Sequence, residues 1–206
     1  MKPELNLRSA VRHLKSADPV LATIIERVGP CRWELRPAAS HFEALLQAII
    51  YQQLHAKAAS NIHGRVLALL PGGEADPAAL LLLSDDALRG AGLSRAKLAA
   101  IRDLAAKAAL GVLPTVDEAH ALTDDELVER LTSVRGIGPW TVHMLLIFRL
   151  GRPDVLPTGD FAIRKAFQVS WRKRKEPKPE TLEKHARAWR PWRSVASWYL
   201  WRSLEG

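Results

Sequence analysis

Residues 131–167, LTSVRGIGPWTVHMLLIFRLGRPDVLPTGDFAIRKAF, contain a short glycine turn between two predicted helices, and this arrangement decides the fold we expect. The turn is Gly136-Ile137-Gly138. Pro139 suits the first position of the helix that follows, because its missing N–H costs nothing there. That helix should run to about residue 150 and end at Gly151, a residue type favoured just past a helix C-terminus.

A second helix should precede the turn, over residues 124–134. Thr123 can cap its first turn, and Glu126 can reach back to the cap, which is the spacing of a capping box. The glycines permit a tight turn that leaves backbone N–H groups bare at a helix N-terminus, and such groups suit a phosphate oxygen. Ile137 can fill the gap between the helices. The pattern predicts a helix-hairpin-helix, which holds a nucleic-acid backbone without reading its sequence; the alternative is an ordinary helix connection.

The remaining chain has the pattern of helices separated by short, punctuated loops. No strand pattern of useful length occurs, and only residues 31–35 look extended, so we expect an all-α fold. Residues 88–105 imitate the hairpin weakly, and an ordinary helix connection is the simpler interpretation. The expected helices span residues 18–28, 40–51, 55–70, 84–90, 94–110, 124–134, 139–150, 160–171, 179–189 and 193–204.

Composition indicates a compact protein of a reducing compartment. With 206 residues, 48% of them hydrophobic, the chain can bury a sizeable core as one domain or two small lobes. Residues 1–15 contain no apolar secretory segment, and no apolar run is long enough to span a bilayer. Cys31 is the only cysteine, which excludes an internal disulfide and an iron–sulfur cluster, since such a cluster needs about four thiolates. We expect a cytoplasmic protein, nucleoid-associated if bacterial, with no membrane partner.

The positive charge of the chain is concentrated in one stretch near its C-terminus. Residues 164–193 contain eleven Lys or Arg and three Glu, a net charge of +8 that equals the net charge of the whole chain. A charge run is often only a solvated face. Because this one follows the hairpin directly, we interpret it as an electrostatic footprint for DNA.

The hairpin, together with the loop Leu156-Pro157-Thr158-Gly159-Asp160 about twenty residues later, resembles the helix-hairpin-helix/GPD superfamily of DNA glycosylases. The sequence is most similar to the 3-methyladenine DNA glycosylase II branch, with its pattern PGIGxWTA…LPxxD. Arg135 stands for the usual Pro and Val142 for the usual Ala. The resemblance extends from about Asp18 to Trp201.

This resemblance implies a single glycosylase unit, residues 1–206, built of two helical lobes with the active site in the cleft between them. One lobe would span about residues 40–150 and carry the hairpin, at 124–150. The other would combine about residues 1–39 with 151–206.

Asp160 is the expected catalytic residue, because it matches the last Asp of the family pattern. Its plainest local interpretation is a helix N-cap, and the two roles are compatible, since helix amides and the helix dipole stabilise a carboxylate. Cleavage of an N-glycosidic bond has a transition state like an oxocarbenium ion, which a nearby negative charge stabilises. The same carboxylate can orient or deprotonate the attacking water.

No second carboxylate stands out as a general acid, and this favours alkylated purines as substrates. A base alkylated on a ring nitrogen is already cationic and leaves as a neutral molecule, so no acid is needed. Superfamily members that also cleave the DNA backbone carry a lysine about four residues after the first Gly of the hairpin, where this chain has Trp140. Tryptophan cannot form a Schiff base, so we expect no lyase activity.

Tryptophans are unusually frequent, at seven against four Phe and two Tyr. Most should be core residues, but an extruded base needs an aromatic slot, and a cationic base gains about 0.5–2 kcal/mol on an indole face. By family position Trp140 and Trp201 would form this pocket. Trp189 and Trp192 match the family's WxPWRS motif, to which we assign a structural role.

The resemblance also implies DNA contacts. Gln53 would be the wedge that fills the space left by the flipped base, and His55 would contact the minor groove; the alternative is a polar helix junction. The other expected DNA-binding residues are Gly136, Ile137, Gly138, Thr141, Arg164 and Lys165.

No cofactor is expected to be required. In related hairpins, free carbonyl oxygens of the turn hold a monovalent or other hard cation near a phosphate. Thr132, Val134 and Gly136 would supply these carbonyls here. The seven histidines show no pairing with Cys or carboxylates that would indicate zinc.

The sequence therefore predicts a monofunctional DNA glycosylase that flips alkylated purine bases out of duplex DNA and hydrolyses their N-glycosidic bond, initiating base excision repair. Its partner would be double-stranded DNA containing alkylated bases, and it would act as a monomer. The alternative is a non-catalytic helix-hairpin-helix DNA-binding module, with Asp160 as a cap and the tryptophans as core.

Overall fold

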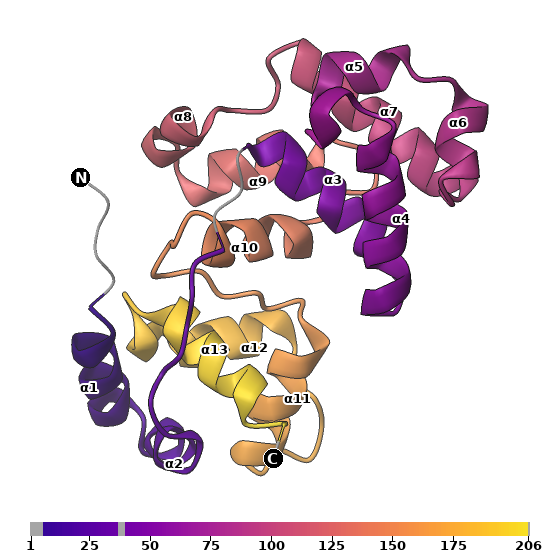
Figure 1. Ribbon diagram of the computed structural model, residues 1–206. Helices are drawn as coiled ribbons and strands as arrows, with labels where there is room; N and C mark the ends of the chain where they lie inside the picture. Colours follow the sequence, from indigo (N-terminus) through magenta and orange to yellow (C-terminus); the bar gives the residue numbers. More distant parts are fainter. Residues whose placement is uncertain (1–5, 37–39, 206) are drawn as a thin grey trace. The chain divides into compact units, whose positions relative to one another are not determined.

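The computed structural model describes residues 6–36 and 40–205, and within these ranges all regular structure is helical (Figure 1). This confirms the all-α fold expected from the sequence. None of the described helices combines the length and the hydropathy needed to cross a membrane. The chain divides into two compact units, residues 1–36 with 146–206 and residues 37–145, which we call unit 1 and unit 2. The expected lobe limits, and a cleft between the lobes, stay a prediction.

Unit 1 is built from two segments that lie far apart in the sequence. Its last helix, α13, contacts α1, α2 and α11. The largest fully buried side chains of this unit are Trp189, Tyr199 and Phe167. Its helices are α1 (Leu7–Ala17), α2 (Pro19–Val28), α11 (Phe161–Ser170), α12 (Pro179–His185), the 3-10 helix η2 (Ala186–Trp189) and α13 (Arg193–Arg202).

Asp18 joins the two segments of unit 1. Its carboxylate caps α2 by accepting from the N–H groups of Val20 and Leu21, at 3.0 and 3.2 Å. The same buried carboxylate accepts from Trp189 Nε1 at 3.0 Å and lies 2.7 Å from His185 Nε2. A buried charge is stable only when it is paired and hydrogen-bonded, and Asp18 meets this condition with partners from both segments.

Unit 2 is one continuous segment centred on α7. This helix lies against α5 and α6 in Figure 1 and contacts α3, α5 and α6. It buries Ile101, Leu104 and Ala105. The helices are α3 (His41–Tyr51), α4 (Ala56–Ala68), the 3-10 helix η1 (Pro71–Gly73), α5 (Pro77–Leu82), α6 (Asp85–Gly90), α7 (Arg95–Ala109), α8 (Val116–Ala121) and α9 (Asp124–Thr132). The next helix, α10 (Pro139–Phe148), begins in unit 2 and ends in unit 1.

Three helices of the structure, α1, α5 and α8, were absent from the sequence-based prediction. Each begins at a recognisable cap. Asn6 accepts from Ser9 N at α1, Asp76 caps α5 ahead of Pro77, and Thr115 forms a full capping box at α8. These helices have 11, 6 and 6 residues, and the two short ones offer too few turns for a hydrophobic periodicity.

Other differences concern helix ends. The segment 31–35, which looked extended, forms no strand. The helix expected over 179–189 changes to a 3-10 turn after His185. The two hairpin helices end at Thr132 and Phe148, each two residues before the expected end. Helix ends are the least determined part of a sequence pattern, because the last turn often tightens to 3-10 geometry.

Candidate active site

Asp160 lies in unit 1 at the start of α11, and the residue is only 7% exposed. Its Oδ1 accepts from the backbone N–H of Ile163 at 2.8 Å, which makes it the N-cap of the helix. Its own N–H donates to the carbonyl of Pro157 at 2.9 Å and closes the turn before it. The cap that the sequence suggested is therefore present, and it fixes the carboxyl group at the positive end of a helix.

Trp201 lies beside this carboxyl group. Its indole Nε1 donates to Asp160 Oδ1 at 3.2 Å, so one oxygen accepts from both the helix amide and the indole. The ring of Phe148 lies 5.7 Å from the Trp201 ring, tilted by 31°. Phe148 was not singled out from the sequence, and no local signal could have found it, because the contact depends on tertiary packing.

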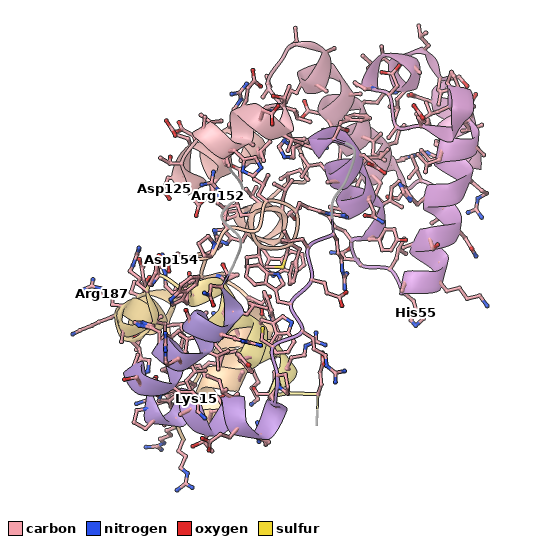
Figure 2. All side chains as sticks on the ribbon, turned by 60° about the vertical axis from the view of Figure 1, so that its left-hand side comes forward. Lys15, His55, Asp125, Arg152, Asp154 and Arg187 are labelled. Carbon is pink, nitrogen blue, oxygen red and sulfur yellow. The ribbon has the colours of Figure 1, made fainter. Side chains whose placement is uncertain are left out.

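The loop that leads to Asp160 contains Asp154, which is labelled in Figure 2, and it is attached to the start of α13. Asp154 accepts from Arg193 Nε at 2.7 Å and Nη2 at 2.9 Å, and from Arg190 Nη1 at 2.8 Å. Ser194 Oγ donates to the carbonyl of Arg152 at 2.6 Å and accepts from Val155 N at 2.9 Å. The segment that contains the WxPWRS motif therefore holds the backbone just before the candidate catalytic residue.

The tryptophans of that motif pack in unit 1. Trp189 is fully buried, and Trp192 is half-buried. These positions agree with the structural role expected for both, and the Asp154–Arg193 contact adds a positioning role for the motif as a whole.

The basic stretch begins on α11 and continues beyond it. Arg164 is half-buried and its Nη2 lies 3.9 Å from Glu176 Oε2, whereas Lys165 is exposed and donates to Gln168 Oε1 at 3.2 Å. Residues 172–175, Arg-Lys-Arg-Lys, are all exposed. Of the two predicted DNA contacts here, Lys165 is the more accessible.

The turn of the hairpin lies in unit 2. Thr123 and Glu126 form the capping box at α9, with Glu126 N 3.2 Å from Thr123 Oγ1 and Thr123 N 2.7 Å from Glu126 Oε2. The hydrogen bond from the Thr123 backbone lowers the pKa of Glu126. Gly136 has φ +80°, which L side chains rarely adopt, and Ile137 is buried. The structure therefore contains the two helices, the glycine turn and the apolar plug that the sequence predicts.

The first turn of α10 carries the next two candidates. Trp140 is 50% exposed, and its role in a base-binding pocket stays a prediction. Thr141 is only 8% exposed, and its contact with DNA stays a prediction. Both residues follow Pro139, the first residue of α10.

The loop between α3 and α4 carries the expected wedge. Gln53 is exposed and has φ +56°, an uncommon conformation for a residue other than glycine. His55 is exposed at the start of α4, and it caps this helix without a side-chain hydrogen bond (Figure 2). Gln52 Nε2 donates to the carbonyl of Gly136 at 2.9 Å, which joins this loop to the hairpin.

The three carbonyls expected to bind a cation surround the hairpin turn. The carbonyl of Val134 accepts from Ile137 N at 3.0 Å, and that of Gly136 accepts from Gln52. A carbonyl oxygen has two lone pairs, so these groups, with Thr132, keep acceptor capacity for a hard cation. The ion stays a prediction. Among the described residues, no three His, Cys, Asp or Glu side chains form a group that could hold a metal.

Known proteins similar to this chain contain the hairpin and the aspartate loop in one family. The chain matches the family described as HhH-GPD superfamily base excision DNA repair protein over residues 46–191, which include the hairpin and Asp160. DNA-3-methyladenine glycosylase 1 of Schizosaccharomyces pombe is 35% identical over 96% of this chain and 88% of its own length. The alkylbase DNA glycosidase-like protein mag2 of the same yeast is 28% identical over 98% of this chain and 96% of its own length.

Two solved structures are similar over most of the chain. The S. pombe 3-methyladenine DNA glycosylase in complex with abasic DNA has a TM-score of 0.82 and 35% identity, over 94% of this chain and 95% of that one. A DNA-3-methyladenine glycosidase from Bacillus halodurans has a TM-score of 0.84 and 35% identity, over 93% and 87%. With its capped hairpin and the aspartate loop that follows it, this chain belongs to the HhH-GPD superfamily of base excision DNA repair proteins.

Proposed function

We propose that this protein is a monofunctional DNA glycosylase that excises alkylated purine bases from duplex DNA and so initiates base excision repair. The observation that carries the proposal is the buried Asp160 carboxyl group, fixed by Ile163 N and Trp201 Nε1 in the loop that follows the hairpin. Relatives at 35% identity named for 3-methyladenine excision support the same activity.

In the proposed reaction Asp160 acts by charge. As the bond between the sugar and the cationic base lengthens, positive charge develops on the sugar, and an ionised carboxylate close to it lowers the energy of that state. The carboxylate also orients the water that attacks the sugar and accepts its proton. The base leaves as a neutral molecule, so the reaction needs no acid to protonate it.

DNA binding in this proposal uses both units. The hairpin turn, Gly136 to Gly138, would hold a phosphate through backbone N–H groups, and the basic stretch of unit 1 would supply general attraction to the duplex. Gln53 would fill the stack after the base is flipped. Trp140 and Trp201 would contact the extruded base. We propose that the enzyme acts as a monomer, in the cytoplasm or on the nucleoid.

The proposal includes the absence of lyase chemistry. Trp140 occupies the position of the lysine nucleophile in the bifunctional members of the superfamily, and it offers no amine. Borohydride added during turnover should therefore trap no covalent complex between protein and DNA. A trapped adduct would overturn the monofunctional assignment.

The central test is release of bases from methylated duplex DNA, measured as free base and as heat-labile abasic sites. We expect release by the wild-type protein and release slower by about 10²–10⁴-fold with Asp160→Asn. A panel of duplexes with single lesions (3-methyladenine, 7-methylguanine, 1-methyladenine and ethenoadenine) defines the substrate range, with cationic bases expected to react best. DNA binding with no release from any duplex would instead support the non-catalytic binding module.

A further inference from the structure

We infer that α7 positions the two DNA-contacting turns of unit 2 relative to each other, and that Lys97 is the positioning residue for the loop that carries Gln53. The inference rests on the proposed function and extends it to residues that need not touch DNA. It comes from a set of polar contacts made by one face of this helix.

Lys97 lies in the first turn of α7 and reaches the C-terminal end of α3. Its Nζ donates to the carbonyl of Ile50 at 2.6 Å and to that of Gln52 at 2.9 Å. The last carbonyls of a helix have no intrahelical partner and carry partial negative charge, so an ammonium group satisfies them well. The side chain is half-buried, and this burial lowers the pKa of the Lys97 ammonium. An ammonium held partly out of water needs such partners to stay there.

These contacts determine the backbone next to Gln53. Lys97 holds the carbonyl of Gln52, and Gln53 follows with its unfavourable φ of +56°. A non-glycine residue stays in this region only where its surroundings hold it there. The side chain of Gln52 meanwhile donates to the Gly136 carbonyl. The wedge loop is therefore fixed on one side by α7 and on the other by the hairpin.

The same face of α7 holds the hairpin further along. Asp103 Oδ2 accepts from Arg135 N and from Lys107 Nζ, both at 2.7 Å, and Lys107 Nζ donates to the Ser133 carbonyl at 2.5 Å. Burial opposes ionisation of Asp103, but these hydrogen bonds outweigh it and lower the pKa of its carboxyl group.

Between the two anchors, the hairpin approaches α7 closely. A Cβ on Gly136 would lie 3.3 Å from Ala100 Cβ. Residues 97, 100, 103 and 107 recur at helical spacing and so share one face of α7. A helix buried against α3, α5 and α6 is rigid, and its length fixes the separation of the groups attached to it. The wedge and the phosphate-binding turn are thereby set at a constant separation.

The first test removes the ammonium of Lys97. We expect Lys97→Met to lower the single-turnover excision rate on a base-paired lesion by about 10–100-fold, while the Kd for undamaged duplex changes by less than about threefold. Arg95→Met is the matched control, because Arg95 is an exposed cation of the same helix turn. It should excise at the wild-type rate. Lys97→Arg, which keeps the charge and the donors, should recover most of the activity.

The second test separates positioning from general destabilisation. A lesion in single-stranded DNA leaves no gap in a stack to fill, so Lys97→Met should excise it at nearly the wild-type rate. The double variant Lys97→Met/Gln53→Ala should lose no more than Gln53→Ala alone, because one residue acts through the other. Equal losses on paired and single-stranded lesions, or additive losses in the double variant, would overturn the inference.

A third measurement detects the wedge without any excision of a base. The fluorescence of 2-aminopurine opposite a stable abasic-site analogue reports insertion of a side chain into the stack. We expect Lys97→Met to reduce the fluorescence change seen on binding, while Arg95→Met leaves it unchanged. A wild-type protein that excises nothing would refute the proposed function alone. An unchanged signal with Lys97→Met would refute the positioning role, whether or not the protein is an enzyme.

Discussion

The loop before α11 and the glycine turn before α10 both end at a helix N-terminus. The loop presents a carboxyl side chain there, and the turn presents backbone. In unit 1 the feature is a charged side chain, Asp160, which is buried and held by an amide and an indole. In unit 2 it is exposed backbone around Gly136, held from behind by long side chains that bind its carbonyls. A helix N-terminus favours negative charge in both places: the fixed Asp160 carboxyl group at α11 and, in the proposed function, an incoming phosphate at α10.

This difference separates chemistry from binding. A transition-state charge must be met by a group that is already in place, because any reorganisation adds to the barrier. A phosphate occurs at every step of a duplex whatever its sequence, so a shallow, exposed turn is sufficient to bind it. Changes at Asp160 should therefore affect the rate of excision, and changes in the hairpin turn and the basic stretch should affect affinity.

The largest expected effect comes from Asp160→Asn. We expect the single-turnover excision rate to fall by about 10²–10⁴-fold with unchanged DNA affinity, because asparagine keeps the helix cap but has no charge. Asp76→Asn, at the N-cap of α5, is the matched control and should excise normally. A near-wild-type rate for Asp160→Asn would place the active site elsewhere.

Raising the salt concentration should have the next largest effect, and this effect should be on the affinity for DNA. Between 50 and 200 mM salt we expect binding to undamaged duplex to weaken by about 10²-fold or more, with little dependence on DNA sequence. Neutralising Lys173, Arg174 and Lys175 to Gln should reduce the slope of log affinity against log salt by up to about three. Fluorescence anisotropy titrations measure both. A flat salt response would mean that the basic stretch faces away from DNA.

A smaller, selective effect should follow from Trp140→Ala. Cationic lesions lose cation–π stacking and neutral lesions do not, so excision of 7-methylguanine should fall by about 3–30-fold and that of ethenoadenine by clearly less. Single-turnover rates on matched duplexes make the comparison. Equal losses on both lesions would assign Trp140 to packing or DNA contact and leave Trp201 as the base-stacking residue.

The smallest effect concerns the anchor of the aspartate loop. Arg193→Lys removes the two-point contact with Asp154, which lysine cannot reproduce, and should lower the free energy of unfolding by about 1–2 kcal/mol. Thermal unfolding should show a Tm lower by about 2–4 °C per kcal/mol. Arg95→Lys is the control, because Arg95 is exposed and its substitution should change nothing measurable. A Tm unchanged by Arg193→Lys would remove the anchoring role.

Local chemistry was readable from the sequence where a few neighbouring residues determine it. The capping box at Thr123, the turn at Gly136 and the cap at Asp160 are all short-range features, and the structure contains each of them. The capping box at Thr115 has the same spacing, yet the helix it begins was missed because it is short.

Contacts between residues far apart in the sequence could not be predicted from such local patterns. The hydrogen bond from Trp201 to Asp160 spans 41 residues, and Lys97 reaches carbonyls 45 and 47 positions away. The exposure of Trp140 likewise depends on what packs around α10. Such contacts follow from tertiary packing, for which one sequence contains no periodic signal.

The discontinuity of unit 1 also has a consequence for biosynthesis. All of unit 2 lies in one uninterrupted stretch, whereas the bonds from Asp18 to His185 and Trp189 join residues 167 and 171 positions apart. During translation α1 and α2 leave the ribosome early. They stay without the C-terminal helices on which they pack until the chain is almost complete. Contacts between such distant positions form slowly, because a long loop must close first. Unit 2 can thus complete its core while unit 1 still exposes apolar faces, and this interval is when a chaperone or protease would meet the nascent chain.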